Sequence, residues 1–158
     1  MRSAVQFYGG INLEMTIHLA RMRELMAAMT DNGDKLWSCH AATRGFQSYL
    51  GLAYEVRDGF FVRKGTCHSW LLAMVNNRPL AIDVLPMGAH GGPIVADIRG
   101  FAPWGELYIE NRDYYADRLS DFDQEGVLFA NALAAADTKL SARYSVSLLA
   151  EALADIEK

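Results

Sequence analysis

The chain has 158 residues, a formal net charge of −4 at pH 7, and 51% hydrophobic against 22% charged residues. This length suits a single domain, residues 1–158, with one hydrophobic core, and the composition is unlike that of a disordered chain. Because the basic residues are few and scattered, the sequence argues against a nucleic-acid partner, which needs a clustered basic surface.

The N-terminal part predicts a helix over residues 12–29. Asn12 can cap this helix, and apolar residues recur at steps of three and four along one face, namely Met15, Leu19, Met22, Met26 and Met29. A methionine stripe of this kind is more often core than a groove for a partner. The segment Asp31–Asp34, with its Asn-Gly pair, should end the helix.

A second helix is predicted from Cys39 to about Leu52. Its apolar face consists of Ala42, Phe46, Tyr49 and Leu50. Ser38 stands where an N-cap residue would stand. The prediction therefore places Cys39 in the first turn of a helix.

The middle of the chain has the short apolar runs and turn residues of strands. The predicted strands cover residues 52–56, 60–63, 69–75, 80–85, 94–98 and 106–109. A tight turn at Arg57–Asp58–Gly59 should join the first two, and Asn76–Pro79 should close a hairpin between the third and fourth. A glycine-rich loop, residues 87–93, follows that hairpin and is a candidate rim for a site.

The last part of the chain returns to helical patterns, over residues 122–136 and 142–157. One face of the second helix carries Val146, Leu149, Leu153 and Ile156. Helices from both chain ends should therefore flank an antiparallel sheet. This predicts an α+β fold.

Cys39 is the first candidate catalytic residue because of its place at a helix start. The positive end of a helix and its free backbone N–H groups favour a thiolate over a thiol. The same N–H groups can hold the oxyanion of a tetrahedral intermediate. An inert buried thiol is the alternative, but Cys39 precedes the apolar face of its helix, which favours a nucleophile.

A thiolate nucleophile needs a proton carrier, and an imidazole held by a carboxylate is the common solution. In a hairpin that turns at Asn76–Asn77, His68 would lie across from residue 84, within one residue of Asp83. Asp83 also lies in an apolar strand, where a carboxylate needs a partner. The residues thus predict a Cys39–His68–Asp83 triad.

Three short motifs resemble those of the transglutaminase-like, papain-related cysteine proteases, amidases and acyltransferases. They are Trp37-Ser38-Cys39-His40-Ala41-Ala42, Cys67-His68-Ser69-Trp70-Leu71 and Leu80-Ala81-Ile82-Asp83-Val84. Arylamine N-acetyltransferases and NlpC-type peptidases share part of this order and match less well. No glutamine precedes Cys39 at the papain-like oxyanion spacing, so the second oxyanion donor is unassigned.

The resemblance implies a transglutaminase-like core in which Cys39 is the nucleophile, His68 the general base and acid, and Asp83 the residue that orients the imidazole. It implies hydrolysis or transfer of an acyl group at a peptide or other amide bond, through a thioester on Cys39. A non-enzymatic binding or maturation module on the same scaffold is the alternative.

Five further residues are candidate substrate contacts around the triad: Trp37, His40, Trp70, His90 and Trp104. His40 could instead tune the pocket, and the tryptophans could equally cover the core. Cys67 should point away from His68 by strand alternation and is more simply read as core.

The N-terminal residues lack a secretory signal pattern, and no apolar stretch is long enough to cross a membrane, so we expect a cytoplasmic protein with free thiols. The cysteine and histidine spacings match no zinc site, and neither a metal nor a cofactor is expected. Peptides or other amides are the expected substrates. Self-association into a homo-oligomer stays open.

Overall fold

The computed structural model describes residues 12–30, 36–62, 66–86 and 92–156. The helices are α1 (Leu13–Thr30), α2 (Cys39–Tyr49) and α3 (Leu119–Ile156), with a 3-10 turn, η1 (Asp113–Tyr115). The strands are β1 (Glu55–Phe61), β2 (Thr66–Val75), β3 (Arg78–Asp83), β4 (Ile94–Asp97) and β5 (Ile109–Glu110).

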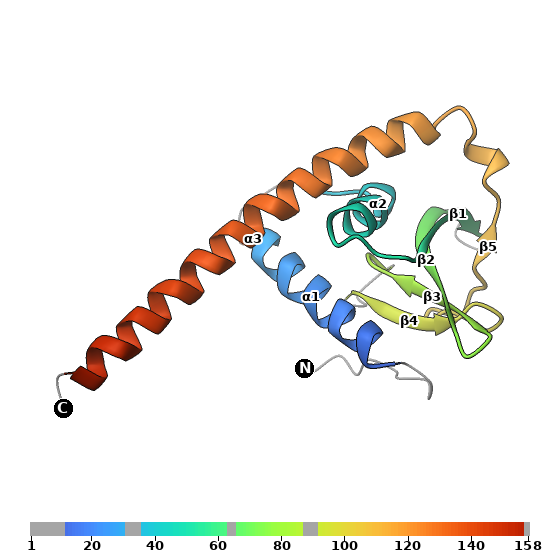
Figure 1. The fold of residues 1–158 in the computed structure, drawn as a ribbon. Coiled ribbons are helices and arrows are strands. Elements are labelled where there is room, and N and C mark those ends of the chain that lie inside the picture. The colour runs from blue at the N-terminus through green and yellow to red at the C-terminus, as the bar shows by residue number, and fades with distance from the viewer. Residues whose placement is uncertain (1–11, 31–35, 63–65, 87–91, 157–158) are drawn as a thin grey trace.

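The strands form one five-stranded sheet in the order β4-β3-β2-β1-β5, and every pair is antiparallel. The helices lie beside this sheet (Figure 1). The predicted α+β class is therefore confirmed.

The two faces of the sheet are covered differently. On one face, α1, α2 and α3 share the larger core with apolar side chains of β2, β3 and β4, including Leu71 and Ile82. On the other face, a smaller aromatic core joins Phe61 and Trp70 to residues of the segment 102–108. Since neighbouring strand residues point to opposite faces, each position of β2 belongs to one core or the other.

The N-terminal helix agrees with its prediction. Asn12 caps α1 by accepting a hydrogen bond from the backbone N–H of Met15 at 2.8 Å. The apolar stripe faces the larger core, with Met15, Leu19 and Met22 buried and Met26 and Met29 partly buried against it. The helix ends at Thr30, and the predicted break at 31–34 lies outside the described residues.

The hairpin of β2 and β3 also agrees closely. Both Asn76 and Asn77 have positive φ angles, 51° and 61°, as a two-residue turn requires. The pair Val75 and Arg78 closes the turn, so the register is one residue from the predicted one.

The predicted turn at Arg57–Asp58–Gly59 is wrong, because these residues lie in the middle of β1 and pair with β2. Asp58 is tolerated inside the strand because Arg44 neutralises it. Gly59 is needed there because a Cβ atom would lie 1.8 Å from the carbonyl oxygen of Ile109 on β5.

The predicted strand 106–109 is only partly right. Leu107 makes an isolated bridge to Phe101, and β5 itself comprises Ile109 and Glu110.

The two predicted C-terminal helices form one continuous helix, α3, which contacts α2 and α1 and then projects beyond them (Figure 1). The residues between the predicted helices, 137–141, contain no glycine or proline, and Asp137 bonds to Arg21 and Tyr49 rather than ending the helix. The apolar stripe from Val146 to Ile156 is exposed rather than packed against the body. None of the described helices is long and apolar enough to span a membrane.

Candidate active site

Cys39 is the first residue of α2, as the sequence predicts. The Ser38 hydroxyl accepts a hydrogen bond from the backbone N–H of Ala41 at 3.1 Å and thereby caps the helix. The N–H groups of the first turn have no intrahelical acceptor, and with the helix dipole they favour negative charge at this end. The partly exposed sulfur of Cys39 therefore lies where an anion is stabilised.

His68 and Asp83 meet on the aromatic face of the sheet. Extending the β2–β3 register by one residue places Asp83 across from Trp70, so His68 and Asp83 are diagonal neighbours. Nε2 of His68 lies 2.7 Å from Oδ2 of Asp83, and both side chains are almost fully buried. Because the carboxylate can only accept, Nε2 carries the proton, and Nδ1 is left to face the sulfur.

Tyr108 completes the carboxylate's surroundings. Its hydroxyl donates to the same oxygen, Oδ2 of Asp83, at 2.9 Å. Burial, reinforced by the charge of Asp83, raises the pKa of Tyr108 far above its ordinary value, so the hydroxyl keeps its proton and remains a donor.

The charges of the cysteine and histidine favour an ion pair. Burial by itself raises the pKa of Cys39, but the hydrogen bonds and charges of His40 and His68 outweigh it and lower the pKa to about 6. Burial by itself lowers the pKa of His68, but the bonds to Asp83 and Cys39 raise it to about 10. At neutral pH this arrangement favours thiolate and imidazolium.

A second hydrogen-bonded chain reaches the same sulfur from the helix-covered face of the sheet. The chain begins at His40, whose Nδ1 lies 2.6 Å from Oγ of Ser69. Ser69 donates to Oδ1 of Asp58 at 2.5 Å, and both oxygens of Asp58 accept from Arg44, at 2.9 and 2.8 Å. All four residues are buried. Of these, the sequence singled out only His40.

Cys67 and Tyr115 complete the surroundings of the thiol. The Cys39 sulfur lies 4.0 Å from the backbone oxygen of Cys67, and both cysteines are free thiols. The hydroxyl of Tyr115 donates to the backbone oxygen of Gly59 at 3.0 Å. Burial, and then the contact with Cys67, raises the pKa of Tyr115 well above its ordinary value.

The structure separates the other predicted substrate contacts from one another. Trp37 packs against Phe129 in the larger core. Trp70 is only 1% exposed and lies behind His68, which it stacks on, so it supports the imidazole. Trp104 lies in the smaller core, edge-on to Phe61, and His90 falls outside the described residues.

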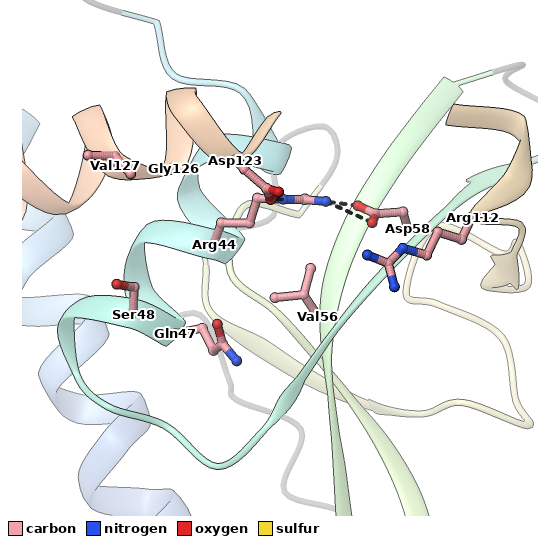
Figure 2. Close-up of a pocket in the computed structure, with 9 residues that line it drawn as sticks. All are labelled: Arg44, Gln47, Ser48, Val56, Asp58, Arg112, Asp123, Gly126 and Val127. Atoms are coloured by element: carbon pink, nitrogen blue, oxygen red, sulfur yellow. Dashed lines mark hydrogen bonds and ion pairs between the residues drawn. The ribbon is translucent and has the colours of Figure 1, made fainter. Parts of the chain in front are cut away.

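A polar pocket of about 270 Å³ lies beyond Arg44, and Cys39 does not line it. In Figure 2, Arg44 reaches across to Asp58 while Arg112 points into the same space. The lining residues come mainly from α2, β1 and α3: Arg44, Gln47, Ser48, Val56, Asp58, Arg112, Asp123, Gly126 and Val127. The Arg44–Asp58 pair therefore separates the pocket from the hydrogen bonds that lead to His40.

Sequence reasoning missed Tyr108, Ser69, Asp58 and Arg44. Two signals could have found part of this set: Arg44 lies in a helical segment of otherwise small and apolar residues, and Asp58 precedes a glycine in a stretch able to form one strand. Buried charges in such places need each other. Tyr108 gave no signal, because its contact with Asp83 joins residues 25 positions apart through a segment with little regular structure.

Within the described residues, no group of three or more histidine, cysteine, aspartate or glutamate side chains could hold a metal ion. No protein-family model matches the sequence, and comparisons with curated proteins and with solved structures found no match either.

Proposed function

We propose that this chain is a cysteine enzyme of the transglutaminase-like type, which hydrolyses an amide bond or transfers its acyl group through a thioester on Cys39. The observation that carries the proposal is the bond between His68 Nε2 and Asp83, because it directs the other imidazole nitrogen to a thiol at a helix start. The order of the three residues along helix, strand and hairpin adds to it.

In the first half of the reaction, the Cys39 thiolate attacks the carbonyl carbon of the amide. The carbonyl π electrons move to oxygen, and the backbone N–H groups at the start of α2 can bind the resulting oxyanion. The C–N bond then breaks as His68 gives its Nδ1 proton to the leaving nitrogen. The products are a free amine and an acyl thioester on Cys39.

In the second half, His68 acts as a base. Its neutral imidazole removes a proton from water, or from an acceptor amine, as that nucleophile attacks the thioester carbon. The thiolate leaves, and the imidazolium is restored beside it. Asp83 and Tyr108 stay in place and hold the ring in one orientation through both halves.

Acyl transfer from p-nitrophenyl acetate, followed by intact-mass and peptide mass spectrometry, tests the proposal. We expect an acetyl group on Cys39 in the wild-type chain, no such adduct in Cys39→Ala, and at least about a hundredfold slower acylation in His68→Ala. The variant Asp83→Asn should also slow acylation, because its amide can offer N–H to the imidazole and favour the wrong tautomer. Acylation at equal rates on Cys39 and Cys67 would instead favour a non-enzymatic module.

A further inference from the structure

The Cys39 sulfur lies between two imidazoles, and the proposed triad uses only one of them. His40 follows Cys39 in the first turn of α2, and its ring stacks flat on Phe122, with ring centres 3.9 Å apart and planes 9° apart. Its hydrogen bond to the sulfur, like that of His68, lowers the pKa of Cys39. The two histidines are held by separate networks on opposite faces of the sheet.

The network behind His40 fixes which of its nitrogens carries a proton. Although burial by itself raises the pKa of Asp58, hydrogen bonds from Arg44 and Ser69 lower it, so Asp58 is a carboxylate. Ser69 has one hydroxyl proton and gives it to that carboxylate. Ser69 must therefore accept from His40, which means that Nδ1 of His40 carries a proton and Nε2 is available to exchange one.

We propose that His40 is a second catalytic imidazole, which exchanges a proton with the Cys39 sulfur through Nε2. The Sγ–H bond breaks, its proton goes to Nε2, and a thiolate and an imidazolium result; the reverse step restores the thiol and the neutral ring. Ser69, Asp58 and Arg44 are positioning residues that keep Nδ1 protonated. This inference rests on the proposed thiolate chemistry of Cys39 and adds a second route to it.

The two networks differ in charge, which separates the two roles. Asp83 meets only His68 and the neutral hydroxyl of Tyr108, so its full charge stabilises the His68 imidazolium. The charge of Asp58 is offset by Arg44 and reaches His40 only through a hydroxyl. His68 is therefore the resting imidazolium, and His40 is the imidazole that can take up a further proton.

The test is the pH dependence of iodoacetamide alkylation at Cys39, read by peptide mass spectrometry. The variant His40→Phe keeps a flat ring against Phe122 but has no nitrogen, and His40→Gln keeps polarity but cannot take up a proton; circular dichroism checks that each folds. We expect each to raise the alkylation midpoint by about one pH unit, a tenfold smaller thiolate fraction at low pH. An unchanged midpoint in a folded variant overturns the inference and leaves the proposed function standing.

Further variants separate this inference from the proposed function. His68→Phe should raise the midpoint but leave it below the ordinary thiol value of about 8.5, and only the double variant should reach or exceed that value. Ser69→Ala should shift the midpoint in the wild-type background and not in His40→Phe, because it acts through His40. If His68→Phe alone reaches the ordinary value, His40 contributes nothing; if His40 variants shift the midpoint and His68→Phe does not, the proposed triad fails instead.

A second inference rests on an independent observation, the exposed end of α3. Every residue from 141 to 156, here called the α3 tail, is exposed to solvent, although a helix of this length is marginal in water without a partner. Its large apolar side chains include four at steps of three, four and three residues: Val146, Leu149, Leu153 and Ile156. This is the spacing of a seam between two helices.

The charges around the seam select the arrangement of those helices. Lys139 and Arg143 lie at the start of this region, and Glu151 and Asp155 lie near its end. Two parallel tails would bring like charges together. In an antiparallel pair with Val146 beside the second copy's Leu153, Arg143 of each copy lies beside Asp155 of the other.

The charge pattern and the seam point to a second copy of this chain as the partner, bound through the α3 tails in an antiparallel pair. Sedimentation equilibrium of the full chain should show a concentration-dependent dimer. Leu149→Glu should weaken it, whereas Tyr144→Glu, about 160° around the helix from Val146, should not. Arg143→Glu should weaken the dimer about fivefold, and adding Asp155→Arg should restore it.

The dimer inference has clear contrary outcomes. It fails if the chain stays monomeric throughout the concentration series, or if Tyr144→Glu weakens association as much as Leu149→Glu. A failure of Asp155→Arg to restore the Arg143→Glu variant would contradict the antiparallel arrangement.

Discussion

The hydroxyl of Tyr108 donates a hydrogen bond of 2.9 Å to the carboxylate of Asp83. Tyr108 is the only neutral donor found on this carboxylate among the described residues, since its other hydrogen bond comes from His68. A neutral donor stabilises the charge without cancelling it, so Asp83 remains able to stabilise the imidazolium. The tyrosine therefore makes a buried carboxylate tolerable at a place where an arginine would weaken its effect on His68.

Removing this hydroxyl should cost stability and leave the thiolate in place. We expect Tyr108→Phe to lower the free energy of unfolding by about 1.5 to 3 kcal/mol, the range for hydrogen bonds to charged groups. Denaturant titration followed by fluorescence measures this. Tyr114→Phe is the matched control, because Tyr114 is 71% exposed and should change little. Equal effects of the two variants would contradict a special role for the Tyr108 hydroxyl.

The reactivity of Cys39 should have an acidic midpoint. Its pKa is lowered to about 6 and that of His68 is raised to about 10, so thiolate and imidazolium coexist between these values. The groups around the sulfur are His40, His68, Cys67 and Tyr115. We expect the alkylation rate to rise through pH 6 and then level off, and kcat/KM for an amide to fall through pH 10 as His68 loses the proton for the leaving amine.

Alkylation of the Cys39→Ala variant gives the background from Cys67 in the same pH series. A midpoint near the ordinary thiol value of about 8.5 would mean that the ion pair does not form.

The parts of the fold that short-range chemistry determines could be predicted from the sequence. Asn12 and Ser38 cap helices where their side chains reach an N–H group three residues ahead, and Asn76–Asn77 is a turn that only a few residue types can form. These local rules were enough to bring His68 and Asp83 within one residue of their true register.

Features that depend on distant partners could not be predicted in the same way. Arg57–Asp58–Gly59 has the composition of a turn, and it is a strand because Arg44 neutralises Asp58 and β5 crosses close to Gly59. The stripe on the α3 tail has the periodicity of a core helix, but no described residue covers it. Periodicity shows that a face is apolar and does not show what covers it.

The two carboxylates on Arg44 should differ greatly in their contribution to stability. Asp58 is 2% exposed and binds Arg44 through two bonds, whereas Asp123 is 71% exposed. Asp58→Asn leaves a buried guanidinium without its main counter-charge, so we expect a loss of about 3 kcal/mol. Asp123→Asn is the matched control and should cost less than about 1 kcal/mol. Denaturant unfolding compares them, and a similar loss in both would show that the buried pair is not special.

Gly59 should tolerate no side chain, because β5 lies directly against it. An added Cβ atom would lie 1.8 Å from the carbonyl oxygen of Ile109 and 2.8 Å from the ring of Trp70. Neither the backbone of β5 nor the buried indole can move freely, so Gly59→Ala should lower the free energy of unfolding by about 3 kcal/mol.

Gly100→Ala is the control, since the nearest atom to its added Cβ is 3.6 Å away. That variant should stay within about 0.5 kcal/mol of the wild type. Hydrogen exchange at Glu110 gives a second measurement, because a displaced β5 should lose its pairing with Gly59. If Gly59→Ala is as stable as Gly100→Ala and Glu110 stays protected, β5 does not lie against Gly59 in solution.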